Sequence, residues 1–346
     1  MDIKEQFTVQ NFLVIKLFLF IFSSFVLAMI CTPIVTHFLY KYEFWKKQKK
    51  LAITGERAVV YEKLHKNKHK RNIPTMAGIL IWGTVLIVTL VANLSRAQTY
   101  LPLFTIVMVG LLGAVDDFVN VKLSNGIAGI SWKKKLFWLF VFAALGALWF
   151  YYKLDINSIH IPGVGDFVIG FWYVPIFIFV ILATANSVNI TDGLDGLAGG
   201  LLAMAFAAYA LIAFFHGQFG IAYFCGTVVG AVLAYTWFNI PPARFFMGDT
   251  GSLALGATLG VVAMLTNTVI PLIFIGFVFL AETSTVVIQI FWKKVFKKKL
   301  FLSTPIHHTF EAIGWPETKV TMRFWVIGAI MTSLGLVIAL IGSGIG

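Results

Sequence analysis

The sequence predicts an all-α protein that crosses a membrane about ten times. Apolar residues make up 59% of the 346 positions and charged residues only 12%, whereas ordinary soluble domains carry about 25% charged residues. The apolar residues gather in runs, and a helical span of a bilayer needs roughly 20 of them. Lys and Arg gather in alternate loops between these runs. Together these observations predict a polytopic integral membrane protein.

Ten apolar runs are expected to form the spans, and together they predict a single transmembrane domain over residues 1–346. The first run is too long for a removed signal peptide and lacks the small-residue cleavage site of one, so it is expected to be retained. The run at 100–115 is short for a span. The runs cover residues 12–40, 75–94, 100–115, 136–152, 168–187, 194–214, 219–237, 250–266, 269–292 and 324–343.

The distribution of positive charge predicts the topology. Of the 27 Lys and Arg residues, 23 lie in the loops at 41–74, 118–135, 238–249 and 293–323. Basic loops face the cytosol, and an even number of spans then places both termini outside. The net charge of +12 thus follows from topology and contact with anionic lipids. No aromatic-basic stacking platform accompanies it, so we expect no nucleic-acid binding.

Two further segments have a recognisable pattern. Residues 153–172 alternate around a Pro-Gly-Val-Gly-Asp turn and predict an outside β-hairpin. The segment 269–299 is long, contains Pro271 and ends in an amphipathic stretch rich in Lys. Such an end can lie at the membrane interface, and we expect this segment to offer an apolar substrate a path from the lipid.

Five of the eight Asp residues are expected at the cytosolic ends of spans far apart in sequence. A charge at mid-bilayer is costly, so we expect these carboxylates to line a water-filled cytosolic mouth. Asn189, Asp192 and Asp195 are spaced by three residues, which places neighbours close together on a helix. The five acids are Asp116, Asp117, Asp192, Asp195 and Asp249.

Convergent carboxylates indicate a Mg²⁺ site, since Mg²⁺ prefers one or two carboxylates plus substrate phosphates. Capping of a helix N-terminus is the simpler alternative for Asp192 and Asp249. It does not explain the adjacent Asp116 and Asp117 at the other end of a helix, where a nearby cation would hold them. Nearby Lys and Arg side chains could receive phosphate oxygens, although most of them are expected to be solvated: Lys66, Lys68, Lys70, Arg71 and Lys133 to Lys135.

Five stretches resemble the bacterial phospho-N-acetylmuramoyl-pentapeptide transferases, a branch of the polyprenyl-phosphate N-acetylhexosamine-1-phosphate transferase superfamily. Their order follows the family, and the His-His and Gly-Trp-Pro-Glu segment is typical of the muramoyl-pentapeptide branch. The stretches are PTMAG (74–78), VDDF (115–118), NSVNITDGLDGLAGG (186–200), FNIPPARFFMGDTGSLALG (238–256) and PIHHTFEAIGWPETKVTMRFW (305–325).

The resemblance implies an enzyme of the bacterial inner membrane. Such an enzyme transfers phospho-N-acetylmuramoyl-pentapeptide from a UDP donor to undecaprenyl phosphate, giving UMP and lipid I at the cytosolic face with Mg²⁺ as cofactor. Two anionic phosphates must meet in this reaction, so charge neutralisation and positioning carry the catalysis. The family also suggests a homodimer. On charge grounds we favour direct attack by the lipid phosphate over a covalent enzyme intermediate.

The resemblance also implies roles for individual residues. Asp249 matches the metal ligand, Asp116 the proposed base and Asp117 its partner near the metal. Asp195, His307 and His308 match further catalytic positions. Substrate-binding positions, with the ring of Phe246 beside uracil, are Lys70, Thr75, Asn189, Asp192 and Phe246.

Several of these residues have structural alternatives. Phe246 could simply pack in the core, and His307 and His308 could be exposed loop residues. Thr75 follows Pro74 and could cap the second span. Glu282 lies well inside a predicted span, where an acid is a functional candidate by default. It could equally hydrogen-bond Ser284 or Thr285.

Three positions depart from the family pattern. Asn120 stands where the family usually has Lys, with Lys122 two residues further on. Thr309 replaces a third His, and Ala77 replaces a Gly. The missing Lys matters most, because a positive charge is expected near the diphosphate.

Two other functions remain as alternatives. The first is the same chemistry with a UDP-N-acetylglucosamine donor. The second is an ion-coupled transporter, although transporters place polar sites at the bilayer midplane, often in repeated halves, and no matching halves are found.

Overall fold

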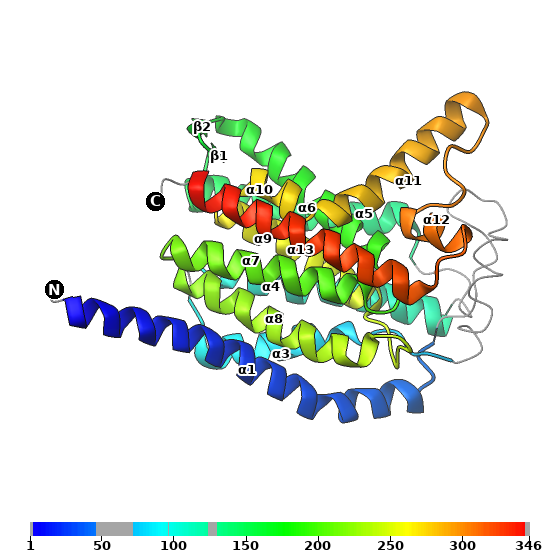
Figure 1. Ribbon diagram of the computed structural model, residues 1–346, viewed down its shortest axis with the longest axis horizontal. Coiled ribbons are helices and arrows are strands. Elements are labelled where there is room, and N and C mark those ends of the chain that lie inside the picture. Colours follow the sequence, from blue (N-terminus) through cyan, green and yellow to red (C-terminus); the bar gives the residue numbers. More distant parts are fainter. Residues whose placement is uncertain (1–2, 46–71, 96, 124–129, 343–346) are drawn as a thin grey trace.

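The computed structural model describes residues 3–45, 72–95, 97–123 and 130–342, which form a bundle of helices (Figure 1). Eight of the described helices are long and apolar enough to cross a membrane, α10 and α11 form a bent pair, and α3 is a shorter apolar helix. These elements match the ten predicted runs and confirm the all-α polytopic architecture. The helices are α1 (Ile3–Lys41), α3 (Gly78–Ala92), α4 (Tyr100–Phe118), α5 (Trp132–Lys153), α6 (Tyr173–Thr191), α7 (Leu197–Phe215), α8 (Phe219–Asn239), α9 (Gly248–Leu265), α10 (Val269–Ile275), α11 (Phe277–Phe296), α12 (Ile306–Ala312) and α13 (Glu317–Gly342).

Helix α9 lies at the centre of the bundle and packs against α3, α4, α6 and α7. Its contact with α4 is close because Gly113 carries no side chain. A Cβ atom added there would lie 2.2 Å from the backbone oxygen of Asp249. The end of α4 that carries Asp116 and Asp117 is therefore held against the start of α9. This packing brings two of the sequence motifs together.

The peripheral helices α1, α5 and α13 turn large apolar side chains outward. Phe22 of α1 is 66% exposed, Leu145 of α5 58% and Ile341 of α13 74%. Contiguous apolar surface of this kind needs a nonaqueous partner. The outer surface thus agrees with immersion in lipid.

The predicted run at 269–292 is broken in two. Helices α10 and α11 meet at an angle of 82°, and the break falls at Gly276, between Ile275 and Phe277, rather than at Pro271. A Pro in the first turn of a helix is tolerated because its missing N–H has no partner there. In Figure 1, α11 leans away from the other helices toward the end of the molecule that carries α12.

Both ends of the chain lie at one end of the bundle, and α12 lies at the other (Figure 1). The predicted hairpin is confirmed next to the chain termini: β1 (Ser158–Ile161) pairs antiparallel with β2 (Gly165–Val168). The side of the membrane that each end faces stays a prediction.

The turn between α6 and α7 corrects one expectation. Helix α6 continues to Thr191, Asp192 is its C-terminal cap, and α7 begins only at Leu197. Gly196 allows this turn because its φ of +77° lies in the left-handed region. Asn189, Asp192 and Asp195 therefore do not share one helix face, and Asp192 does not cap the N-terminus of α7.

Candidate active site

Asp116 of α4 and Asp249 of α9 meet at the ammonium group of Lys135 from α5. Lys135 Nζ lies 2.9 Å from Asp116 Oδ2 and also contacts Asp249 Oδ2. The backbone N–H of Ile130 donates to Asp116 Oδ1 at 2.6 Å. The structure thus brings together two of the predicted acids and one Lys that the sequence interpretation left in a solvated run. Lys133 and Lys134 are exposed, as expected.

Asn189 joins this group from α6. Its Nδ2 donates to Asp249 Oδ1 at 3.1 Å and to Ser252 Oγ at 2.8 Å. Because the amide is held from two sides, its orientation is fixed. We call Asp116, Lys135, Asn189 and Asp249 the acidic cluster.

Asp117 points to a different partner from its neighbour Asp116. Its Oδ2 accepts hydrogen bonds from the backbone N–H of Thr250 at 3.0 Å and from the Thr250 hydroxyl at 2.8 Å. The carboxylate thereby caps the N-terminus of α9, where a negative charge is favourable. Asp249 itself lies in the first turn of α9, where a carboxylate complements the helix dipole, as the structural alternative for this residue expects.

Gly248 makes room for Asp117 and Thr75. Its φ is +67°, and an added Cβ would lie 2.3 Å from Asp117 Oδ2 and 2.4 Å from Thr75 Oγ1. Thr75 is buried, and it does not cap the second span. Helix α3 begins three residues later, after Ala77, without a side-chain cap, so that alternative is wrong.

Phe246 lies beside the same segment through its backbone. Its N–H donates to Pro74 O at 2.8 Å, and its O accepts from Ala77 N at 3.0 Å. Its side chain is half-buried. The predicted contact with uracil stays a prediction.

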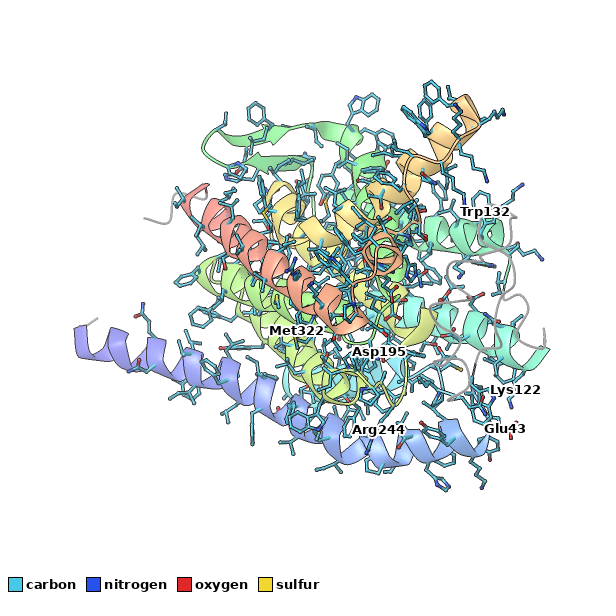
Figure 2. The ribbon with its side chains drawn as sticks, turned by 45° about the vertical axis from the view of Figure 1, so that its right-hand side comes forward. Glu43, Lys122, Trp132, Asp195, Arg244 and Met322 are labelled. Carbon is cyan, nitrogen blue, oxygen red and sulfur yellow. The ribbon has the colours of Figure 1, made fainter. Side chains whose placement is uncertain are left out.

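Asp195 lies in a separate group that anchors the segment before α9. Its Oδ2 accepts from Ala243 N at 3.0 Å, and its own N–H donates to Glu317 Oε1 at 2.6 Å. Asn239 spans the turn next to it, accepting from Gly196 N at 3.0 Å and donating to Phe245 O at 2.9 Å. Figure 2 shows Asp195 apart from Trp132, which begins α5. The predicted catalytic role of Asp195 is not tested by these contacts.

His307 and His308 are buried on the short helix α12, so the exposed-loop alternative is wrong. His307 Nδ1 lies 3.0 Å from Glu282 Oε2, and His308 Nδ1 lies 2.7 Å from Glu311 Oε2. Burial lowers the pKa of the His308 imidazole, and the neighbouring His307 adds to this effect, although Glu311 opposes it. His308 is therefore neutral near pH 7.

The family's usual Lys position, Asn120, is buried. Lys122 does not take over there, because its ammonium contacts the backbone oxygen of Tyr42 and lies 5.1 Å from the ring centroid of Phe44. Lys135 supplies the described ammonium group beside Asp116. Lys70, together with Lys66, Lys68 and Arg71, lies outside the described residues.

Sequence reasoning did not single out Lys135 from its neighbours, and it missed several other residues of these groups. Lys135 is one of three consecutive Lys residues, and only the rotation of α5 shows which of them turns inward. Ser252 and Asn239 are ordinary polar residues inside apolar helices, with no motif of their own. Glu311 and Glu317 lie in the stretch 305–325 that resembles the family, and this resemblance could have identified them as candidates.

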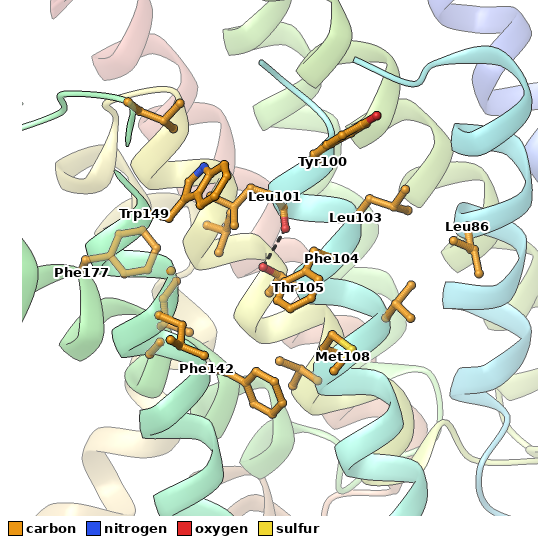
Figure 3. A pocket seen from close by; sticks show the side chains of 18 of the residues that line it. Leu86, Tyr100, Leu101, Leu103, Phe104, Thr105, Met108, Phe142, Trp149 and Phe177 are labelled. Atoms are coloured by element: carbon orange, nitrogen blue, oxygen red, sulfur yellow. Dashed lines mark hydrogen bonds between the residues drawn. The ribbon is translucent and has the colours of Figure 1, made fainter. Parts of the chain in front are cut away.

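A large apolar cavity lies between helices that include α4 and α5, which also carry Asp116 and Lys135 of the acidic cluster (Figure 3). It has a volume of about 690 Å³ and is lined mainly by α3, α4, α5 and α6. Leu139 in its lining follows Lys135 by four residues, which is about 6 Å along a helix. Phe104, Phe142, Trp149 and Phe177 contribute aromatic walls. The cavity is suited to a hydrocarbon chain and not to a nucleotide.

The acidic cluster has the donors that a hard cation needs. Asp116 and Asp249 turn carboxylate oxygens toward one shared position, and the Lys135 ammonium group lies there as a cationic stand-in. Mg²⁺ is held by one or two carboxylates with substrate phosphates and waters, so these residues fit. Among the described residues, no group of three or more His, Cys, Asp or Glu could hold a metal alone.

Comparison with known proteins decides the family. Residues 99–267 match glycosyl transferase family 4. A phospho-N-acetylmuramoyl-pentapeptide-transferase of Geobacillus sp. (strain WCH70) is 39% identical over 325 residues, covering 92% of this chain and 96% of the relative. The chain belongs to the phospho-N-acetylmuramoyl-pentapeptide transferase family. A transferase of this name from Bacillus subtilis (strain 168) is 35% identical over 323 residues, again covering 92% and 96%.

Membership of the phospho-N-acetylmuramoyl-pentapeptide transferase family settles the class of the protein. It is a transferase and a multi-pass protein of the bacterial inner membrane, and the transporter alternative is set aside. The family 4 match includes every Asp of the predicted site. Thr75, His307 and His308 lie outside that match but inside the resemblance to the transferases.

Proposed function

We propose that the chain transfers phospho-N-acetylmuramoyl-pentapeptide from its UDP donor to undecaprenyl phosphate, releasing UMP and forming lipid I. The observation that carries this proposal is the convergence of Asp116 and Asp249 on Lys135 in a member of this family. Phosphoryl transfer is catalysed mainly by positioning and charge neutralisation. The acidic cluster offers both, because fixed carboxylates and an ammonium group lie within contact of one another.

In the proposed reaction, an oxygen of the carrier phosphate attacks the phosphorus that bears the sugar. A bond forms between these two atoms, the bond to the bridging oxygen breaks, and its electron pair leaves with UMP. Asp116 accepts a proton if the carrier phosphate arrives protonated. Lys135 neutralises phosphate oxygens as the two anionic groups approach. We favour this direct route over a covalent intermediate on an Asp.

Mg²⁺ is part of the proposal. Asp249 and Asp116 would hold it, with Asn189 orienting the Asp249 carboxylate through the bond at 3.1 Å. Bound there, the ion would neutralise diphosphate charge and polarise the phosphorus–oxygen bond that breaks. With the ion on the carboxylates, the flexible stem of Lys135 would let its ammonium group contact a phosphate oxygen instead.

The donor nucleoside is expected near Asn189, Asp192, Thr75 and Phe246. Support comes from the backbone pairing between Phe246 and the 74–77 segment, which holds two of these residues side by side. Lys70 is expected there as well. The site is expected to face the cytosol, and the homodimer stays a prediction.

The carrier's apolar chain fits the cavity of Figure 3. The cavity shares α4 and α5 with the acidic cluster, so a phosphate at Lys135 and a chain in the cavity can belong to one lipid. The cavity volume of about 690 Å³ lies within the range of roughly 300–1,000 Å³ that is usual for ligand pockets. This location differs from the path along 269–299 that the sequence predicts.

The test is a UMP-release assay on detergent-purified protein. It supplies UDP-N-acetylmuramoyl-pentapeptide, undecaprenyl phosphate and Mg²⁺. Release should require the lipid, stop with a chelator and fall about 100-fold or more in Asp249→Asn. Asp155→Asn is the matched control, because Asp155 is exposed near the β-hairpin. Release with UDP-N-acetylglucosamine, and none with the muramoyl donor, would contradict the proposal.

A further inference from the structure

Glu282 and His307 form a buried pair outside the acidic cluster. Glu282 lies on α11 and His307 on α12, and both side chains are 0% exposed. Glu282 Oε2 lies 3.0 Å from His307 Nδ1 and 3.5 Å from its backbone nitrogen. One carboxylate oxygen thus faces both the ring and the main chain of the same residue.

The sequence offered Thr285 as one hydrogen-bond partner for the Glu282 carboxylate, but Thr285 bonds elsewhere. Thr285 donates its hydroxyl to the backbone oxygen of Glu282 at 2.7 Å, and not to the carboxylate. A buried carboxylate is costly unless it meets a partner. His307 is the described partner that meets it, so the pair is the reason for an acid at this depth.

The far edge of the His307 ring lies against the family motif between α6 and α7. A Cβ atom added to Gly193 would lie 2.5 Å from His307 Nε2. Gly193 follows Asp192, which is expected in the donor pocket. A glycine at this position therefore lets the imidazole edge reach the loop that carries the predicted nucleoside-binding residues.

His307 Nδ1 and Nε2 are both buried, and neither ring nitrogen makes a hydrogen bond of normal geometry among the described residues. A neutral imidazole has one N–H and one acceptor nitrogen, and the bond made by one nitrogen fixes the state of the other. The Glu282 carboxylate oxygen 3.0 Å from Nδ1 favours a proton on that nitrogen, and Nε2 is then the acceptor. Buried polar atoms are normally satisfied, so this nitrogen points to a ligand.

His308 is a second titratable group beside the His307 ring. The ring of His308 lies at 4.1 Å between centroids and 68° between planes. His308 is itself turned to Glu311 at 2.7 Å. Glu282 is therefore the carboxylate in direct contact with the His307 ring.

We infer that Glu282 is a positioning residue: it fixes the Nδ1–H form and the orientation of His307, so that Nε2 accepts a polar hydrogen of the sugar-nucleotide donor beside Gly193. This inference rests on the proposed function for the identity of the donor. His307 touches the substrate, and Glu282 acts only through His307. Carboxylates that orient a metal-ligating His matter by about 10- to 100-fold, and we expect an effect of similar size for His307.

The test compares Glu282→Leu, Glu282→Gln, His307→Gln and the double variant Glu282→Leu/His307→Gln in the UMP-release assay. We expect Glu282→Leu to lower kcat by about 10- to 100-fold, with a much smaller change in KM for the donor. Glu282→Gln keeps an acceptor oxygen and should recover part of that loss. The double variant should be no slower than His307→Gln alone. Thr285→Val, a buried polar change on the same helix, is the control.

Melting temperatures of the same four variants without substrate test the pair independently of the reaction. Effects of contacting residues are non-additive, so the stability losses should not sum. If the wild type releases no UMP with the muramoyl donor, the proposed function fails. If the melting-temperature losses of Glu282→Leu and His307→Gln add up in the double variant, the two side chains do not interact, and the inference fails. Multiplying kcat losses, or a folded Glu282→Leu variant with wild-type kcat, would overturn the positioning role. If Glu282→Leu fails to fold, the same comparison runs on Glu282→Gln.

Discussion

The carboxylate of Asp117 on α4 holds the start of α9 through two hydrogen bonds from Thr250, at 3.0 Å from its N–H and 2.8 Å from its hydroxyl. Its sequence neighbour Asp116 turns instead to Lys135 at 2.9 Å. Adjacent residues on a helix are rotated by about 100° from each other. The two acids of one motif therefore perform different tasks.

We expect Asp117→Ala to destabilise the protein by about 1–3 kcal/mol, because it leaves a buried backbone N–H of α9 without its acceptor. Asp116→Asn should lower UMP release more than it lowers stability, since it removes a charge beside Lys135 and keeps the shape. Thermal unfolding in detergent and the release assay measure both variants. If Asp117→Ala and Asp116→Asn lose the same stability and the same activity, the two acids do not perform different tasks.

Lys135 offers a second comparison, because two exposed Lys residues precede it. Lys135→Met should reduce UMP release by about 100-fold, as expected when one electrostatic contact to a transferring phosphate is removed. Lys134→Met removes the same charge one position earlier and should leave release within about twofold. A similar loss in both variants would show that Lys135 contributes only to the general positive charge of the loop.

These residues also show what the sequence could predict. The apolar runs predicted the helices because bilayer thickness sets their length. The convergence of acids at one end of the bundle was predicted too, and Asp116 and Asp249 indeed share Lys135. The cap that Asp117 gives to Thr250 joins residues 133 positions apart, and no local pattern encodes such a pairing. The end of α6 at Thr191 was missed because a helix can outlast its apolar run.

The apolar cavity predicts a selective effect on the lipid substrate. Gly146 on α5 lines it, and an added Cβ would lie 3.2 Å from the ring of Phe177. Gly146→Leu should fill part of the cavity and raise the KM for undecaprenyl phosphate several-fold, with the KM for the UDP donor unchanged. Gly83→Leu on α3 is the control, since a Cβ there meets no atom within 4 Å and Gly83 does not line the cavity. Equal effects of both variants would contradict the lipid assignment.

Acid should destabilise the protein through His308. Burial lowers the pKa of its imidazole in the folded state, while the unfolded chain titrates near the ordinary value of about 6.5. As pH falls through about 6.5, the unfolded state therefore binds a proton that the folded state does not, and stability decreases until the folded-state pKa is passed. Melting temperatures between pH 7.5 and 5.5 should fall less steeply in His308→Gln than in the wild type. The comparison uses slopes, because the substitution also removes the contact with Glu311 at every pH. Parallel slopes would assign the acid sensitivity to other groups.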